Sequence, residues 1–160
     1  MELAKEELQA RVERAVALFK EGYNCSQSVV AAFADLYGYS QEQALRMSAS
    51  FGGGIGRMRE TCGAACGLFM LAGLKYGATE ATDRKGKSLN YAVVQELAKE
   101  FEQANHSLNC GELLGLQAKR HRDPQAAERT ESYYEKRPCV KMVESAATLW
   151  VNYLLRQSNA

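Results

Sequence analysis

The chain has 160 residues with 20 Lys and Arg against 19 Asp and Glu, so its formal net charge is +1. Without a strong net charge, no long-range field attracts nucleic acid or an anionic membrane, and we expect neither partner. No apolar run reaches the roughly 20 residues of a membrane span, and the charged segment 1–7 does not resemble a signal peptide. We therefore expect a soluble, cytoplasmic protein, in which residues 1–160 form a single domain that needs no disulfides to fold.

Helical periodicity extends along nearly the whole chain, and no segment alternates polar and apolar residues as a half-buried strand would. The chain also contains only two prolines. The pattern predicts an all-α protein, a bundle of about six or seven helices around a central apolar helix.

Two helices are predicted in the first quarter of the chain. The first covers residues 8–19 with a helical apolar stripe and ends at Gly22. The second begins near Asn24, where Asn24 and Gln27 form the pattern of a capping box, and continues to Gly38.

The middle of the chain combines a short helix, a glycine-rich loop and the expected central helix. Ser40 and Gln43 repeat the capping pattern at the start of the short helix. The loop 51–60 follows and leads to Thr61, which we expect to cap a helix over 62–77. That helix is apolar on most faces, which is typical of a buried position.

The rest of the chain contains two longer helices, a short one and a polar excursion. After a polar connection over 78–87, a helix carries its buried stripe over 91–101. A short piece starts at Cys110, and the polar segment 117–136 is expected at the surface, part of it helical. The last helix covers 138–154.

Five cysteines are present, and four of them stand where a helix is predicted to begin: Cys25, Cys62, Cys110 and Cys139. Three follow Asn or Thr, which are good N-caps, and the fourth follows a proline, which suits the first helical position. Free backbone N–H groups and the helix dipole stabilise a thiolate there, so we expect thiol pKa values lowered from about 8.5 toward roughly 3.5–7.5. In a reducing compartment, clustered cysteines are more often catalytic or metal-binding than structural.

Cys66 is the fifth cysteine and lies four residues after Cys62. On one helix the two β-carbons would be about 5–6 Å apart, whereas a disulfide needs roughly 3.5–4.5 Å. A bond between them is therefore disfavoured, although the pair could flank a metal ion. The alternative is that Cys66 is a small apolar residue in a packed helix.

The cysteine spacing does not match a common metal module. No Cys-x-x-Cys pair is present, so neither a zinc ribbon nor a thioredoxin-like site is indicated. Widely separated ligands from several helices still suit an iron–sulfur cluster or another soft metal. The candidate metal ligands are Cys25, Cys62, Cys66, Cys110 and Cys139.

The glycine-rich loop is a second candidate binding element, with Gly53, Gly54 and Arg57 as its candidate residues. It lacks the features of a Walker A or dinucleotide-binding motif. Glycine there is expected mainly to allow close approach and positive φ. A small anion or a substrate carboxylate at this end of the predicted helix stays open.

The two histidines lie apart from the cysteines in sequence. His106 follows the predicted fifth helix and is expected as a C-terminal capping or surface residue. His121 belongs to a basic run that is expected to be a solvated face.

Several motifs in fixed order resemble one family. They are Gly22-Tyr23-Asn24-Cys25-Ser26-Gln27-Ser28, Phe51-Gly52-Gly53-Gly54, Thr61-Cys62-Gly63-Ala64-Ala65-Cys66-Gly67, Gly73-Leu74-Lys75-Tyr76-Gly77, Cys110-Gly111-Glu112-Leu113-Leu114-Gly115 and the late Cys139. Together, over roughly residues 15–154, they resemble the bacterial and archaeal C-GCAxxG-C-C family. The resemblance implies a helical protein with a cysteine-based redox role, without a settled substrate or reaction.

Two mechanisms fit these residues. In thiol–disulfide exchange one cysteine attacks and a second resolves the mixed disulfide; in cofactor binding the same thiolates hold iron–sulfur or a soft metal. Both require Cys25, Cys62 and Cys110 to converge with Cys139 close by, and we expect oxidation to join Cys62 to one of the other three. A redox partner or a small-molecule substrate is implied.

Three points stay open. The chain could instead be a helical interaction protein without chemistry, and the sequence does not decide whether it is an enzyme. It also leaves open whether the chain forms a homo-oligomer.

Overall fold

The computed structural model describes residues 3–116 and 122–160, and this part of the chain contains α-helices, two 3-10 helices and no strand. The predicted all-α class is therefore confirmed. The α-helices are α1 (Lys5–Glu21), α2 (Cys25–Ala31), α3 (Gln41–Ser48), α4 (Gly63–Tyr76), α5 (Arg84–Asn105), α6 (Cys110–Leu113), α7 (Glu131–Lys136) and α8 (Cys139–Ser158); the 3-10 helices are η1 (Ala34–Tyr37) and η2 (Ala49–Phe51).

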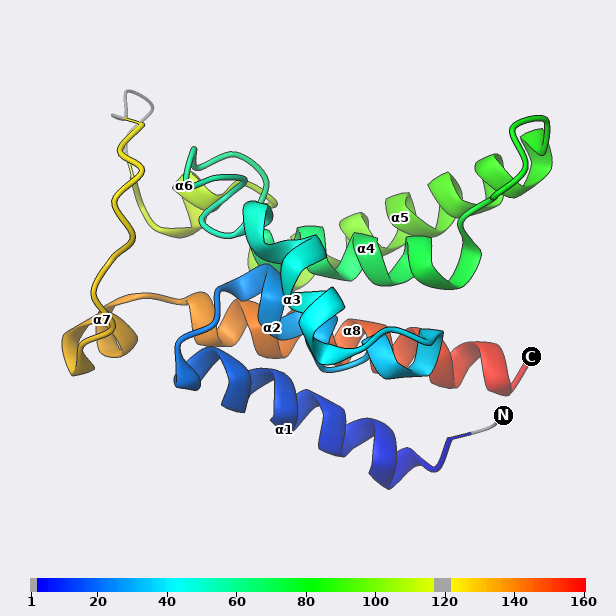
Figure 1. The fold of residues 1–160 in the computed structure, drawn as a ribbon, viewed down its shortest axis with the longest axis horizontal. Helices are drawn as coiled ribbons and strands as arrows, with labels where there is room; N and C mark the ends of the chain where they lie inside the picture. The colour runs from blue at the N-terminus through cyan, green and yellow to red at the C-terminus, as the bar shows by residue number, and fades with distance from the viewer. Residues whose placement is uncertain (1–2, 117–121) are drawn as a thin grey trace.

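Two antiparallel helix pairs form the body of the molecule (Figure 1). Helices α1 and α8 run side by side, and α4 pairs with α5. Helix α2 is central, because it contacts α1, α3, α4 and α8. The largest fully buried side chains include Phe19, Phe33, Phe101 and Trp150. None of the described helices has the length and apolar character needed to span a membrane.

The predicted second helix is divided in two. Helix α2 ends at Ala31, Phe33 leaves the helical region with φ −128°, and η1 then ends at Gly38 with φ 84°. Residues 29–34 are all at most 5% exposed, and a straight helix would have pointed this run of side chains in all directions. The break turns the chain so that each of them faces the core.

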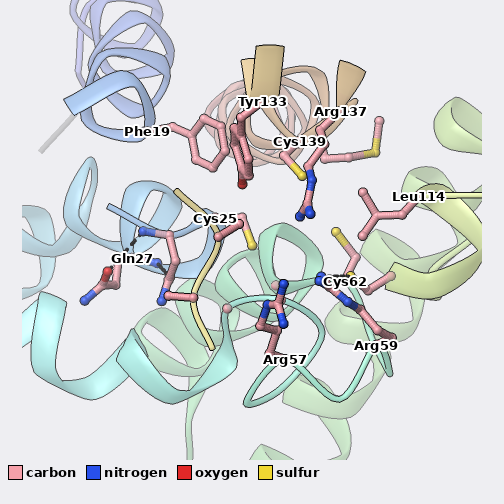
Figure 2. A pocket seen from close by; sticks show the side chains of 18 of the residues that line it. Phe19, Cys25, Gln27, Arg57, Arg59, Cys62, Leu114, Tyr133, Arg137 and Cys139 are labelled. Atoms are coloured by element: carbon pink, nitrogen blue, oxygen red, sulfur yellow. Dashed lines mark hydrogen bonds between the residues drawn. The ribbon is translucent and has the colours of Figure 1, made fainter. Parts of the chain in front are cut away.

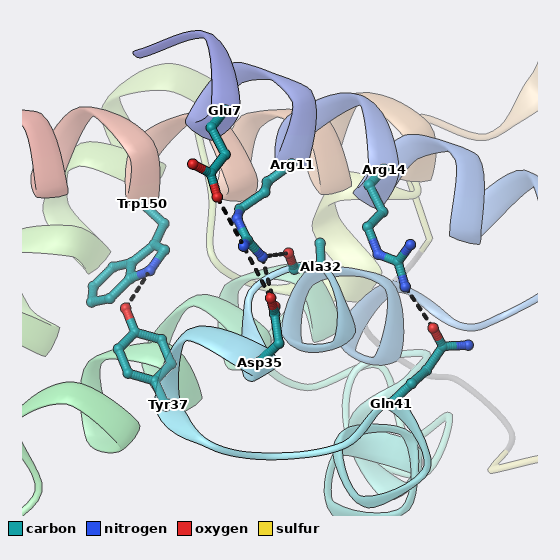
Figure 3. Close-up of polar contacts among 8 residues, drawn as sticks. All are labelled: Glu7, Arg11, Arg14, Ala32, Asp35, Tyr37, Gln41 and Trp150. Atoms are coloured by element: carbon teal, nitrogen blue, oxygen red, sulfur yellow. Dashed lines mark hydrogen bonds and ion pairs between the residues drawn. The ribbon is translucent and has the colours of Figure 1, made fainter. Parts of the chain in front are cut away.

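A polar cluster fixes η1 against α1 (Figure 3). The Arg11 guanidinium lies 2.6 Å from an Asp35 carboxylate oxygen and also donates to the Ala32 carbonyl at 3.0 Å. Nearby, the Trp150 indole N–H donates to the Tyr37 hydroxyl at 3.1 Å. These bonds hold the segment after the α2 break in one place.

Helix α5 begins earlier than predicted, at Arg84, because the Asp83 side chain accepts a hydrogen bond from the Gly86 N–H at 2.8 Å and caps it. Helix α4 is the apolar helix that the sequence predicts, and it contacts α2, α5, α8 and both 3-10 helices. Its first residues, 63–68, are all buried.

Close approach of α2 and α4 depends on a missing side chain at Gly67. A β-carbon there would lie 2.9 Å from the Val29 β-carbon and 3.1 Å from the Ser26 carbonyl oxygen. Both neighbours are held in the packed α2 helix, so neither can move away easily.

We therefore expect Gly67→Ala to lower the free energy of unfolding by about 1–3 kcal/mol through overpacking, less a gain of up to about 1 kcal/mol in helix propensity. Gly73→Ala is the matched control, because it lies in the same helix with nothing within 4 Å of its added β-carbon. That variant should gain about 0.4–1 kcal/mol. Urea unfolding measures both, and a Gly67→Ala protein as stable as Gly73→Ala would contradict the packing argument.

Candidate functional site

A cavity of about 480 Å³ lies at the end of the bundle where several helices begin (Figure 2). Four of the five cysteines line it: Cys25, Cys62, Cys110 and Cys139. They come from the starts of α2, α4, α6 and α8. The four cysteines that the sequence groups by helix position thus share one space.

The start of α2 is held by the predicted capping box. The Asn24 side chain accepts from the Gln27 N–H at 2.9 Å, and the Gln27 side chain accepts from the Asn24 N–H at 3.1 Å. The Asn24 amide also donates to the Ala49 carbonyl at 2.9 Å. Cys25, the first residue of α2, is thereby tied to the segment after α3.

Cys62 and Cys110 are positioned by backbone pairing that the sequence does not reveal. Thr61 and Asn109 form an isolated antiparallel bridge, with the Cys62 N–H donating to the Leu108 carbonyl and the Cys110 N–H donating to the Glu60 carbonyl, both at 2.6 Å. Because side chains alternate along paired segments, the two cysteines lie on the same face.

The prediction that Thr61 caps α4 is wrong, since Thr61 is occupied in the bridge and Cys62 itself stands at the N-cap position without a side-chain capping hydrogen bond. Pro138 is predicted at the first helical position of α8. It takes the N-cap position instead, and Cys139 is the first helical residue. At α6 the expected cap is present, because the Asn109 side chain accepts from the Glu112 N–H at 2.9 Å.

Two glycines bring backbone against the thiols. A β-carbon on Gly54 would lie 2.5 Å from the Cys110 β-carbon, and one on Gly63 would overlap the Cys25 sulfur. Gly53 lines the cavity directly, with a positive φ of 67°. At Gly53 and Gly54 the glycine-rich loop thus has the expected steric role of glycine, and Gly63 has the same role at the start of α4.

Arg57 and Arg59 line the cavity from the glycine-rich loop, and both have a left-handed backbone with φ 62°. Such a conformation in a residue with a side chain costs on the order of 1–3 kcal/mol and is found preferentially at functional sites. Arg57 donates to the Asp123 backbone carbonyl at 2.9 Å. Arg59 is buried, with a guanidinium nitrogen 3.7 Å from the Cys110 sulfur.

Two further arginines that the sequence reasoning missed, Arg129 and Arg137, also line the cavity. Arg129 donates to the carbonyls of Phe19 and Tyr23 at 2.9 Å each and lies over the Phe19 ring. Arg137 lies over the Tyr133 ring at 4.8 Å. The only sequence signal for Arg137 is its position two residues before Cys139, and nothing in the local sequence distinguishes Arg129.

Burial raises the pKa of most of the thiols, so the expectation of lowered pKa values is wrong for three of the four helix-start cysteines: Cys25, Cys62 and Cys139. Burial raises the pKa of Cys25, of Cys62, and, to about 11 each, of Cys66 and Cys139. The N–H groups expected at a helix start are present, and those of Gly53 and Ser26 act to lower the pKa of Cys25. Desolvation of the thiolate outweighs them.

The thiols also influence one another. After burial, the largest effect that raises the pKa of Cys62, of Cys66 and of Cys139 is the negative charge of a Cys25 thiolate, and Cys110 acts on the same three residues. Each of these three thiols is therefore harder to ionise once Cys25 is charged, so Cys25, Cys62, Cys66 and Cys139 titrate as a linked set.

Cys66 stands apart from the cavity. It is not among the lining residues, and its thiol donates to the Thr61 carbonyl at 3.7 Å, back along α4. Residues 3–116 and 122–160 contain no group of three or more His, Cys, Asp or Glu side chains arranged to hold a metal ion. Metal ligation by the five cysteines stays a prediction.

His106, the one histidine among the described residues, does not line this cavity. His106 is exposed and ends α5 in a left-handed conformation, with φ 72° and its N–H bonded to the Glu102 carbonyl at 2.7 Å. The predicted capping role is confirmed. His121 and the basic residues directly before it lie outside the described residues.

By its fold and its site, the protein is an all-α protein in which cysteines from four helix starts share one cavity. The family model described as "Putative redox-active protein (C_GCAxxG_C_C)" matches residues 23–153, and the chain belongs to this family. The resemblance carried by the motifs is thereby confirmed. No curated protein and no solved structure matches the chain significantly.

Alkylation of Cys139 should follow its raised pKa. Because the thiolate is the reactive form, the native rate should still rise between pH 9 and 10, toward a pKa of about 11. In urea-unfolded protein the alkylation rate of the same cysteine should level off once the pH passes the ordinary pKa of a thiol. Mass spectrometry after timed iodoacetamide pulses measures both profiles. A native rate that reaches its plateau below pH 9 would show that burial does not control this thiol.

Burial of Cys66 should make the reduced protein less stable in alkali. Its pKa is raised from 9.0 to about 11 in the folded state, so the native thiol keeps a proton that the unfolded one loses. The stability that Cys66 contributes by keeping this proton is fully present below pH 9 and is lost as the pH rises toward 11. The free energy of unfolding then falls by an amount on the order of 2 kcal/mol. Between pH 8 and 10.5, reduced wild type should lose more unfolding free energy than Cys66→Ala. Equal losses in urea unfolding would contradict this.

Proposed function

We propose that the protein carries out thiol–disulfide exchange, with Cys25 as the attacking thiol and Cys62 as the resolving thiol. The observation that carries the proposal is that four thiols from separate helices line one cavity. Membership of a redox-active family supports it.

Cys25 is chosen as the attacking group for its exposure and its surroundings. Its side chain is half-buried, whereas Cys62 and Cys110 are only 6% and 8% exposed. The N–H groups of Gly53 and Ser26 are placed to stabilise its thiolate. Cys139 is also half-buried, but Cys25 is the one of these two thiols whose thiolate the N–H groups of neighbouring residues act to stabilise.

Cys62 is chosen as the resolving group for its closeness to Cys25. The Cys25 sulfur lies against Gly63, the residue directly after Cys62. The charge of Cys25 is also the largest charge effect on the pKa of Cys62. The two residues belong to different helices, so the spacing that disfavours a Cys62–Cys66 bond does not apply to them.

The reaction balances without a cofactor. The Cys25 thiolate attacks one sulfur of a disulfide RSSR, forming Cys25–S–S–R and releasing RS⁻. The Cys62 thiolate then attacks the Cys25 sulfur, forming Cys25–S–S–Cys62 and releasing the second RS⁻. The two protons lost by the cysteines end on the two released thiols. The protein is oxidised by two electrons, RSSR is reduced to two RSH, and a dithiol reverses the reaction.

Thiol counting and peptide mapping test the proposal. Reduced protein, prepared without oxygen, should fall from five free thiols to three when treated with a small disulfide, and dithiothreitol should restore five. Mapping should find a Cys25–Cys62 bond. Cys66→Ala is the matched control and should form the same bond, whereas Cys25→Ser and Cys62→Ser should not.

Other outcomes would contradict it. Five unreactive thiols in the folded protein would exclude exchange and favour a helical interaction protein. Stoichiometric metal or visible absorption in protein isolated without oxygen, lost in Cys62→Ser, would instead support the iron–sulfur or metal-binding alternative. A dominant bond from Cys25 to Cys110 or Cys139 would overturn the choice of Cys62.

A further inference from the structure

We propose that the substrate is a small disulfide bearing negatively charged groups, and that Arg137 selects it inside the cysteine cavity. The inference rests on the proposed exchange function and adds the substrate class. It starts from the charges of the side chains that line the cavity.

Positive side chains line this cavity without negative ones. Four arginines contribute to the lining, and the described lining residues include no Asp or Glu: Arg57, Arg59, Arg129 and Arg137. Burial raises the pKa of the lining thiols Cys25, Cys62 and Cys139, which opposes a negative counter-charge on them near neutral pH. A cavity of this kind attracts anions and disfavours cations.

The arginines differ in how their charges are satisfied. Arg57 faces an exposed carboxylate, that of Asp123, at 3.5 Å. Arg129 is held by two backbone carbonyls, so its role is to join the α1–α2 turn to the segment before α7. The Arg137 guanidinium makes no hydrogen bond or ion pair with a described residue and only stacks on the Tyr133 ring, while its backbone N–H donates to the Tyr133 carbonyl at 3.1 Å.

Arg137 is also the arginine placed beside the reacting groups. It precedes Cys139 by two residues, and its charge acts to lower the pKa of that thiol. Figure 2 shows its guanidinium directed into the space between Cys139 and Cys25. A guanidinium offers several N–H donors in a planar fork that fits a carboxylate or a sulfonate.

The dimensions favour a small molecule over a folded protein. A volume of about 480 Å³ is typical of small-ligand sites. Cys25, the attacking thiol, lines this cavity, so the disulfide that it attacks has to reach into the cavity. The ligand must enter the cavity, where its charged ends meet arginine.

A matched series of small disulfides tests the inference. The probes are 3,3′-dithiodipropionate with two carboxylates, its disulfonate counterpart 2,2′-dithiodiethanesulfonate, neutral 2-hydroxyethyl disulfide and cationic cystamine. Each oxidation rate of reduced native protein is divided by the rate with urea-unfolded protein, which removes intrinsic differences among the reagents. A carboxylate preference over the sulfonate would identify the anionic group.

We expect the normalised rate for at least one dianion to exceed that of the neutral disulfide by roughly tenfold or more, the effect of one charge-assisted hydrogen bond. Arg137→Gln should reduce this ratio toward one, and Arg137→Lys should restore part of it. Arg156→Gln is the control. Arg156 lies near the C-terminal end of α8, away from Cys139, and pairs with Glu96 and Glu100 of α5. This variant should keep the full rate ratio. Equal normalised rates for all four probes in wild type would overturn the inference.

Suberate, a dicarboxylate of similar length without a disulfide, separates this inference from the proposed function. It should slow alkylation of Cys25 and Cys139 in wild type but not in Arg137→Gln. Exchange without suberate protection or charge preference would refute the anionic substrate and leave exchange standing. Suberate protection without oxidation by any probe would refute exchange and leave the anion site standing.

Discussion

The structure depends on the close contact of α2 with α4 and with the glycine-rich loop. Gly52, Gly63 and Gly67 meet Asn24, Cys25 and Val29 at distances that leave no room for a β-carbon. Because backbone, and not a side chain, faces α2 at these points, the start of α2 can enter the corner between loop and helix. Thiols from separate helices can then share one small cavity, and any side chain at Gly63 would displace the Cys25 sulfur.

The same closeness makes the helix starts weaker as thiolate sites. A charge near a helix end is stabilised by about 0.3–1 kcal/mol, and by up to about 2 kcal/mol in favourable cases. Full burial shifts a pKa by as much as 3–5 units, which is several kcal/mol. Close packing of thiols adds repulsion between their charges. The helix starts therefore supply position, while burial decides protonation.

Local signals in the sequence are sufficient for part of this architecture. The capping boxes at Asn24 and Ser40 are read from residues three apart, and both form. The role of Thr61 could not be read in this way, because its bridge depends on Asn109, far along the chain. The break at Phe33 and the placement of Arg137 likewise follow from tertiary packing. Sequence thus predicted which cysteines begin helices, but not their protonation or the cations around them.

High thiol pKa values explain why binding would have to govern the chemistry. Compared with 9.0, a pKa of about 11, as at Cys139, lowers the thiolate fraction at pH 7 about a hundredfold. The more basic thiolate is also a stronger nucleophile, which raises the rate of attack roughly tenfold. The net rate at pH 7 is therefore about tenfold lower. Holding a disulfide against the thiol can supply effective concentrations of 10⁵ M or more. A buried site of this kind reacts slowly with reagents that it does not bind. In the exchange that we propose, the arginines that line the cavity would therefore determine which disulfides are reduced.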